Sequence, residues 1–347
     1  MKSPGSFRLL APTIIAIAVV GILLPSGSST SNLSDALVVY CSCDASIAEA
    51  VIEAFEQKTG IEVDVRFDEE ANKSLGLTNL LIAEQQNPRC DVYWNNQTLG
   101  TIRLAGQGVL QPYASVHASR IPDQFKAHDA LWCGFSARLR VFLVNTDAME
   151  ATEESVATVL ETGSLQRVAI AQPLFGTTLS HYSVLAGEIG LADVKAWHAE
   201  VQERGIQEVR GNSMTRDLVA EGVCDIGYTD TDDAFGAIDR NKPVAILPVR
   251  TPSGKTICLP NSVAMIRDCP HPDKAKQFID FLLSEEAEVM LANQSARQIP
   301  LGPVDESLLP SELRQLQTWA AEGVELSAGA EVNGEVLDWL MSEYQGQ

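Results

Sequence analysis

Histidine and the usual hydrolase motifs are scarce in this 347-residue sequence. It has five histidines, at positions 117, 128, 181, 198 and 271, and no two of them have the H-x-x-x-H spacing of a zinc-ligand pair. No G-x-S-x-G segment marks a nucleophile elbow. Basic residues are also few, because 25 lysines and arginines stand against 46 acidic residues, which gives a net charge of −21. A surface this acidic repels nucleic acid and anionic lipid, so neither is predicted as a partner.

Long apolar runs are also lacking, except for one at the N-terminus. Lys2 and Arg8 precede the apolar run Leu9–Leu24, and small and polar residues follow it. This order is typical of a secretory signal, so residues 1–34 are predicted to be an export segment that sends the rest of the chain to the periplasm or the extracellular space. The run is short for a membrane span and is interrupted by Pro12; an uncleaved N-terminal anchor stays as the alternative.

Cysteine is sparse for an exported chain. The seven cysteines, at positions 41, 43, 90, 133, 224, 258 and 269, are odd in number, so at least one is expected to be free or to pair elsewhere. Cys41 and Cys43 are close enough in the sequence to be a pair of metal ligands. The favoured interpretation is nevertheless two small buried side chains at the end of a strand.

Alternating strand and helix patterns fill most of the chain, in two blocks. The first block predicts strands and helices in turn over residues 36–41, 44–60, 61–67, 73–86 and 90–94. The second block does so over residues 168–171, 177–188, 191–204, 213–221, 224–228, 232–240 and 244–249. Helical patterns then cover residues 271–283, 285–293, 310–321 and 332–344. Strands that alternate with helices form a parallel sheet covered by helices, so the sequence predicts an α/β fold.

Two extended stretches, 136–145 and 256–266, connect these blocks. A chain of this length exceeds the usual size of one hydrophobic core, so we expect two lobes joined by these stretches as hinge crossings. Each lobe is predicted to be a mainly parallel sheet flanked by helices. The predicted boundaries place residues 36–135 and 267–347 in the first lobe and residues 136–266 in the second.

Four strand-to-helix loops are the predicted binding region. Ligands of such sheets bind beyond the carboxyl ends of the strands, where helix N-termini present free N–H groups. The loops cover residues 42–44, 94–98, 173–178 and 228–233.

Several short segments around these loops resemble the ferric-iron-binding family of periplasmic solute-binding proteins. They lie, in chain order, at residues 39–41, 60–63, 70–73, 90–96, 134–141, 260–264 and 270–275. The resemblance covers nearly the whole chain after the export segment. It implies a two-lobed clamshell that binds a small solute in the cleft, works as a monomer, and delivers the solute to an ABC permease in the inner membrane. It implies a transport function, with no catalytic residue.

The sequence departs from that family where two adjacent tyrosines typically hold the metal. By position, Thr231 and Asp232 replace the pair. Asp44 corresponds to the histidine or acid of the first loop, and Asn96 to the acid of the second. Tyr228 is the one tyrosine nearby, and its place in a strand directs it elsewhere.

The remaining predicted site residues match an anion cradle. Gly176, Thr177 and Thr178 open a helix whose N–H groups favour an oxyanion, and Asn212 stands at another helix start. Arg138 offers a planar pair of donors to a carboxylate, carbonate or phosphate, and Arg140 lies on the same strand face. The alternative is that both arginines pair with structural carboxylates.

An acidic cluster, Asp230, Asp232 and Asp233, leaves the ligand open. These side chains either cap a helix or receive a cation in the cleft. Ferric iron would use Asp44, Asp232 and Asp233 together with a companion anion; a phosphorylated, phosphonate or zwitterionic solute needs no metal and no cofactor. A secreted metal-dependent hydrolase that uses Asp230–Asp233 is the alternative function. Trp94 and Trp132 either stack on a ligand or, as the favoured interpretation, belong to the core.

Overall fold

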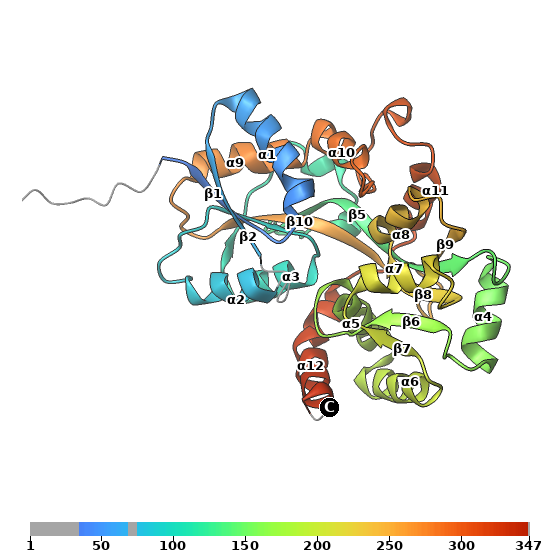
Figure 1. Ribbon diagram of the computed structural model, residues 1–347. Coiled ribbons are helices and arrows are strands. Elements are labelled where there is room, and N and C mark those ends of the chain that lie inside the picture. The colour runs from blue at the N-terminus through green and yellow to red at the C-terminus, as the bar shows by residue number, and fades with distance from the viewer. Residues whose placement is uncertain (1–34, 69–74, 346–347) are drawn as a thin grey trace, which may run out of the picture. The chain divides into compact units, whose positions relative to one another are not determined.

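The computed structural model describes residues 35–68 and 75–345 (Figure 1). The predicted export segment 1–34 and the resembling segment 70–73 lie outside the described residues. The described residues from Ala36 onward form one compact unit. Among the described residues, no helix has both the length and the apolar character that crossing a membrane requires.

The first block of strands and helices forms one side of a mixed sheet. Its elements are β1 (Leu37–Cys41), α1 (Ala45–Thr59), β2 (Val63–Phe67), α2 (Leu75–Ala83), β3 (Val92–Asn95), α3 (Leu99–Gly106) and β4 (Leu110–Gln111). Strand β1 pairs in parallel with both β2 and β3. Helix α1 buries Ile47, Val51 and Phe55, which recur at helical spacing, and ends at Gly60 in the left-handed conformation that glycine favours.

The second block forms the other side of the sheet. Its elements are α4 (Glu153–Thr162), β6 (Val168–Ala171), α5 (Gly176–Ile189), α6 (Leu191–Glu203), β7 (Gln207–Val209), α7 (Asn212–Ala220), β8 (Ile226–Asp230), α8 (Thr231–Ile238) and β9 (Val244–Pro248). Strand β6 pairs in parallel with β7 and β8. The carboxyl ends of these strands therefore meet the N-termini of α5, α7 and α8 at one edge.

Two long strands join the blocks, as the sequence predicts. Strand β5 (Cys133–Asn145) pairs with β10 (Cys258–Ile266) through its first half and with β8 and β9 through its second half, always antiparallel. Strand β10 continues to β3, so the main path runs β2-β1-β3-β10-β5-β8-β6-β7. The sheet is thus parallel in its outer parts and antiparallel at the crossing.

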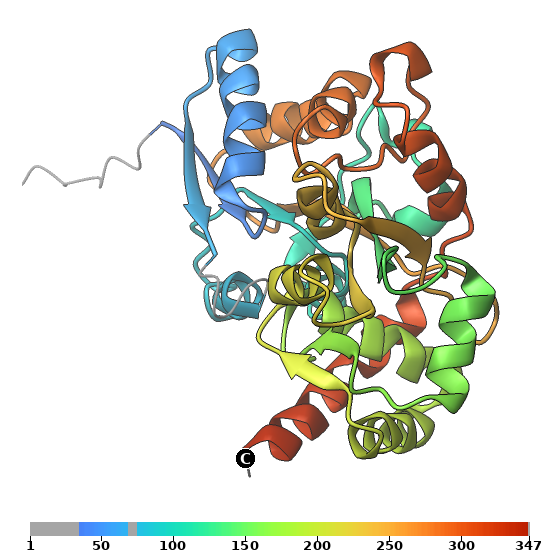
Figure 2. The same ribbon diagram turned by 45° about the vertical axis from the view of Figure 1, so that its right-hand side comes forward.

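The helices after β10 cover both blocks. They are α9 (Pro272–Leu282), α10 (Glu285–Ala292), α11 (Leu313–Ala321) and α12 (Ser327–Tyr344). Helix α12 lies against α5 (Figure 2), where Asn333 Nδ2 donates to Ser183 Oγ at 2.9 Å. The approach is close, because a Cβ on Gly187 would stand 2.6 Å from the backbone nitrogen of Gly329. The predicted lobe boundaries place α12 in the first lobe, but its buried residues share a core with the second block.

Some local predictions differ from the structure. Helices α3 and α4 and the short strand β4 carry too little periodic signal in the sequence and are not predicted. Strand β8 begins at Ile226 and ends at Asp230, two residues later than predicted at both ends. Helix α12 begins at Ser327, five residues before its predicted start at Val332. Its first turn contains Gly329, which weakens the helical pattern but permits the contact with α5.

All seven cysteines lie in the described residues, and all are buried. Burial raises the pKa of the Cys133 thiol to about 12 and that of Cys224 to about 11. Cys41 and Cys43 are core residues, as the favoured interpretation predicts.

Candidate functional site

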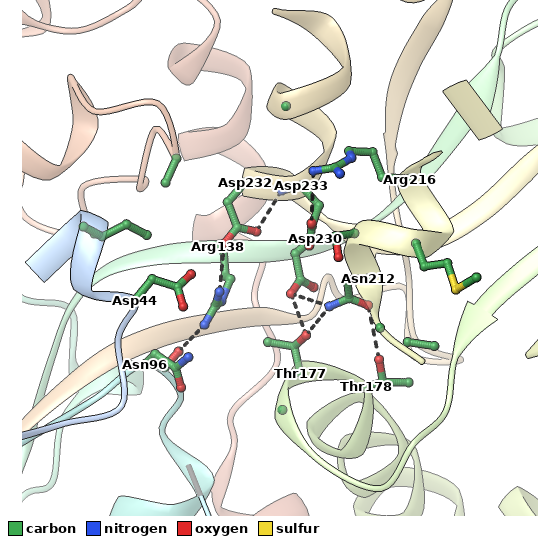
Figure 3. Close-up of a pocket in the computed structure, with 18 of the residues that line it drawn as sticks. Asp44, Asn96, Arg138, Thr177, Thr178, Asn212, Arg216, Asp230, Asp232 and Asp233 are labelled. Carbon is green, nitrogen blue, oxygen red and sulfur yellow. Dashed lines mark hydrogen bonds and ion pairs between the residues drawn. The ribbon is translucent and has the colours of Figure 1, made fainter. Parts of the chain in front are cut away.

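A cleft of about 820 Å³ opens where the two blocks meet (Figure 3). Its walls come from the starts of α1, α5, α7 and α8, from the loop after β3, from β5, and from residues 295–296 after α10. The cleft therefore lies where parallel strands end and helices begin, as the sequence predicts. Chain segments far apart in the sequence meet there because both crossing strands pass beneath it.

The first block contributes Asp44 and Asn96 to the cleft. Asp44 precedes α1 as its N-cap residue, with no side-chain hydrogen bond into the helix. Asn96 follows β3 and is only 6% exposed. Its backbone oxygen accepts a hydrogen bond from Arg138 Nη2 at 2.8 Å, whereas its Oδ1 is buried without a hydrogen-bond partner. Asp44 and Asn96 therefore lie on the side of the cleft that Arg138 lines.

Arg138 and Arg140 leave β5 on the same face but reach different depths. Arg138 lines the cleft, with its Nη1 2.8 Å from Asp232 Oδ2, and its side chain is 12% exposed. Burial by itself lowers the pKa of Arg138, but the neighbouring carboxylates, Asp232 first, outweigh it and raise the pKa. Arg140 is fully buried behind the cleft wall, with its Nη1 2.7 Å from Asp230 Oδ1. Arg140 therefore fits the alternative prediction, in which the arginine pairs with a structural carboxylate.

The starts of α5 and α7 form a hydrogen-bonded wall. Thr177 Oγ1 donates to Asp230 Oδ2 at 2.5 Å, and Asn212 Nδ2 donates to the same oxygen at 2.9 Å. Thr178 Oγ1 donates to Asn212 Oδ1 at 3.3 Å. Gly176 has φ +60°, a left-handed conformation in which a side chain is strained. These contacts set the two helix N-termini side by side toward the cleft (Figure 3).

Carboxylate oxygens of Asp230, Asp232 and Asp233 lie within 4.8 Å of one another. Burial raises the pKa of Asp232, although Arg138 opposes the shift. Burial and the adjacent carboxylate of Asp232 raise the pKa of Asp233 well above its ordinary value. For both side chains the charged form is therefore less favoured than in an exposed aspartate.

The structure corrects one predicted site residue. Thr231 does not line the cleft, because its side chain is fully buried and its Oγ1 accepts a hydrogen bond from the backbone of Leu139 at 3.3 Å. Tyr228 also points away from the cleft and packs on Phe142, with ring centroids 4.8 Å apart. Trp94 belongs to the core and contacts Phe135 at 5.5 Å.

The other predicted residues, Asp44, Asn96, Arg138, Gly176, Thr177, Thr178, Asn212, Asp232 and Asp233, all line the cleft. Their role in binding a ligand stays a prediction. Asp230 of the predicted acidic cluster lines the cleft as well, and the cleft also contains Arg210, Arg216, Ser295 and Ala296, which the site prediction omits. Arg210 and Arg216 flank the predicted start of α7, which is a signal the sequence does carry. Ser295 and Ala296 follow a helix of the other block, and only tertiary packing brings them here.

Known proteins share this architecture. A family model described as bacterial extracellular solute-binding protein matches residues 50–315. Iron uptake protein A1 of Synechocystis is 25% identical over 254 residues, which cover 70% of this chain and 69% of that protein. The major ferric iron-binding protein of Neisseria meningitidis is 24% identical over 312 residues, 87% of this chain and 88% of that protein. A putative 2-aminoethylphosphonate-binding periplasmic protein of Salmonella typhimurium is 23% identical over 291 residues, 81% of each chain.

Two solved structures confirm the predicted two-lobed fold class. The apo ferric ion-binding protein A of Pasteurella haemolytica has a TM-score of 0.77 at 18% identity and covers 90% of this chain and 98% of its own. The periplasmic binding protein AfuA of Actinobacillus pleuropneumoniae, with exogenous fructose-6-phosphate bound, has a TM-score of 0.71 at 18% identity. It covers 89% of this chain and 98% of its own.

Proposed function

Because this chain belongs to the family of bacterial extracellular solute-binding proteins, we propose that it captures a small metal-free solute with an anionic head group. The solute binds in the cleft between the blocks and is delivered to the permease of an ABC importer. The protein works as a monomer, exported by the segment 1–34. Family members of this kind bind solutes for transport, and we assign no catalytic residue.

The observation that carries the proposal is that each carboxylate of the acidic cluster lies beside an arginine. Asp230 lies 2.7 Å from Arg140, and Asp232 lies 2.8 Å from Arg138. Asp233 lies 3.7 Å from a nitrogen of Arg216. A trivalent cation entering this cluster would meet three guanidinium groups and would have to break their ion pairs. Burial also disfavours the charged forms of Asp232 and Asp233, as the raised pKa of each indicates, and only the charged form of a carboxyl group coordinates a metal.

An anionic head group has a better position at the starts of α5 and α7. The first N–H groups of a helix have no partner within that helix, and its dipole favours negative charge. Two such ends and Arg210 line the same part of the cleft. The rest of the solute then faces Asp44, Asn96 and Asp232, whose oxygens accept hydrogen bonds from hydroxyl or ammonium groups. A sugar phosphate or an aminophosphonate has both kinds of group.

The relatives support this range of ligands. The Salmonella typhimurium relative is described as binding 2-aminoethylphosphonate, and AfuA holds fructose-6-phosphate. The relatives described as iron proteins favour ferric iron with a companion anion as a second candidate. The specific observation for iron is the three carboxylates within 4.8 Å, which together with Asp44 offer oxygen ligands. Such a complex would lack the visible colour that tyrosine ligands give.

Calorimetry on chelator-treated protein tests the proposal. The titrants are 2-aminoethylphosphonate, fructose-6-phosphate, inorganic phosphate and ferric citrate. We expect at least one phosphorus compound to bind without metal and ferric citrate to bind weakly. A tight, strongly coloured ferric complex, with no binding of the phosphorus compounds, contradicts the proposal.

Two further measurements test the mode of action. Small-angle scattering is expected to show a more compact protein with bound ligand, because solutes of two-lobed proteins close the cleft about the crossing strands. Scattering that is unchanged by a bound ligand speaks against this mechanism. Hydrolysis of a chromogenic phosphate ester by the purified protein would instead support the metal-dependent hydrolase.

A further inference from the structure

A short segment after α10 connects three parts of the cleft. Gln294 Nε2 donates to the backbone oxygen of Ile47 in α1 at 3.1 Å. At the other end, Ile299 exchanges two backbone hydrogen bonds of 2.7 Å with Ala137 of β5. Between these anchors, Ser295 and Ala296 line the cleft. We call residues 294–299 the strap, because they run from the helix that begins after Asp44 to the crossing strand.

Arg297 extends from the strap to the second block. Its Nη1 and Nη2 donate to the two carboxylate oxygens of Asp239 at 2.9 Å and 2.7 Å. Asp239 lines the cleft and is the C-cap residue of α8, the helix that carries Asp232 and Asp233. The Arg297 guanidinium also lies 4.7 Å from the ring centroid of Phe235, a buried residue of α8.

The remaining guanidinium nitrogen of Arg297 binds an acidic residue further along the chain. Its Nε lies 2.8 Å from Glu312 Oε1, at the start of α11. One planar group thus bridges α8 and α11. An arginine fork is suited to this task, because it donates in two directions and stacks on an aromatic ring at the same time. A lysine has no fixed pair of donors with which to hold both oxygens of Asp239.

We propose that Arg297 is a positioning residue of the binding cleft, and that its paired contact with Asp239 sets the spacing between the strap and α8. Helix α8 is short, so a shift of its end at Asp239 moves Asp232 and Asp233 at its start. The contact therefore holds the acidic wall at a defined distance from Asp44 and the strap. The relevance of this contact to solute capture rests on the proposed function. Its effect on the spacing between the strap and α8 does not.

A distance measurement without ligand tests this proposal separately from the proposed function. Cysteines replace Glu53 on α1 and Glu161 on α4, two exposed positions in different blocks, and receive spin labels. The seven native cysteines are buried, so labelling is directed to the introduced pair. Pulsed electron resonance then gives the distribution of distances between the blocks.

We expect Arg297→Ala and Asp239→Asn to shift or broaden this distribution by about 2 Å or more, the size of a genuine interdomain rearrangement. Glu312→Gln is the matched control, because it removes an ion pair of Arg297 that does not involve α8. Reversal of the pair, Arg297→Asp with Asp239→Arg, is expected to restore the narrow distribution, and Arg297→Lys to restore it only in part. Asp239→Asn keeps the test valid if Arg297→Ala does not fold.

Two results overturn the proposal. One is an unchanged distribution in both Arg297→Ala and Asp239→Asn. The other is a change of the same size in Glu312→Gln, which would make Arg297 a support of α11 rather than a spacer across the cleft.

Discussion

Arg138 and Arg140 are two residues apart on one strand and have the same side chain, yet they occupy unlike environments. Arg138 reaches the cleft, where it holds Asp232 and the backbone of Asn96 and retains a 12% exposed side chain. Arg140 is fully buried beneath the cleft, where its Nη1 lies 2.7 Å from Asp230 and 3.1 Å from Asn212 Oδ1. The first can exchange a protein contact for a ligand contact, whereas the second holds the wall in place.

The difference shows that some charged residues of this cleft stabilise its wall, whereas others are placed to contact a ligand. Asp230 is 1% exposed and receives hydrogen bonds from Thr177 and Asn212 as well as from Arg140. A buried carboxylate with that many donors is a fixed part of the scaffold. Asp232, two residues further on, is 14% exposed and its partner Arg138 is 12% exposed, so a ligand in the cleft can compete for this ion pair.

Arg140→Met should have the largest effect, and that effect should be on stability. Removal of one partner of a fully buried ion pair leaves Asp230 uncompensated and costs about 3–5 kcal/mol. Chemical denaturation measures this loss as a lower free energy of unfolding. The double variant Arg140→Met with Asp230→Asn should recover part of it, because the orphaned charge is then absent. A stable single variant would mean that Arg140 is not the support described above.

Arg138→Ala should act mainly on ligand binding. Loss of a charge-assisted contact in a closed cleft costs about 1.5–3 kcal/mol, on the order of ten- to a hundredfold in affinity. Calorimetry with the compound that binds best to the wild-type protein measures it, and unfolding curves show whether stability is retained. We expect a larger loss of affinity than for any Arg140 variant that still folds. Equal and negligible losses in both would show that the two arginines are structural.

Asp233→Asn and Asp239→Asn should change stability in opposite directions. The raised pKa of Asp233 means that the folded protein binds this proton more tightly, so stability is lost as pH rises from the ordinary value of 3.8 through the raised value. Asn removes this loss and should stabilise the ligand-free protein at neutral pH by up to about 1 kcal/mol.

Asp239 behaves in the opposite way. Its hydrogen bonds from Arg297 lower its pKa, so its contribution is present above 3.8 and is lost as pH falls below that value. Asp239→Asn should therefore destabilise the protein at neutral pH. Thermal unfolding of both variants between acid and neutral pH checks the two slopes; equal slopes would contradict the assigned environments.

Arg167→Ala should have the smallest effect and serves as the control for arginine removal. Arg167 forms two close hydrogen bonds through Nε to Asp225, but its side chain is 54% exposed. Exposed pairs of this kind contribute about 0–1 kcal/mol, and this one lies outside the cleft. Unfolding and ligand titration should both stay close to wild type. A loss of stability as large as that of Arg140→Met would show that burial does not determine how much each arginine contributes to stability.

The order of strands and helices could be predicted from the sequence. Apolar strands alternate with amphipathic helices, and this local pattern predicts β1, α1, β6 and α5 within one or two residues. It also predicts the two crossing strands and the strand-to-helix loops, because the edge of a parallel sheet follows from the order of its elements. Nine of the predicted residues consequently line the cleft.

Which side chains face the cleft, and what they contact there, depends on tertiary packing and could not be predicted. The register of β8 against β5 places Asp230 beside Arg140, and Thr231 is buried next to it. The predicted strand lies two residues too early and ends before Asp230, so the sequence could not predict these contacts. The strap and α8 are far apart in the sequence: Arg297 and Asp239, which contact each other, are 58 residues apart. Contacts of such range depend on how the blocks pack. Local periodicity reports which face of an element is buried, but it contains no information on the partner that buries it.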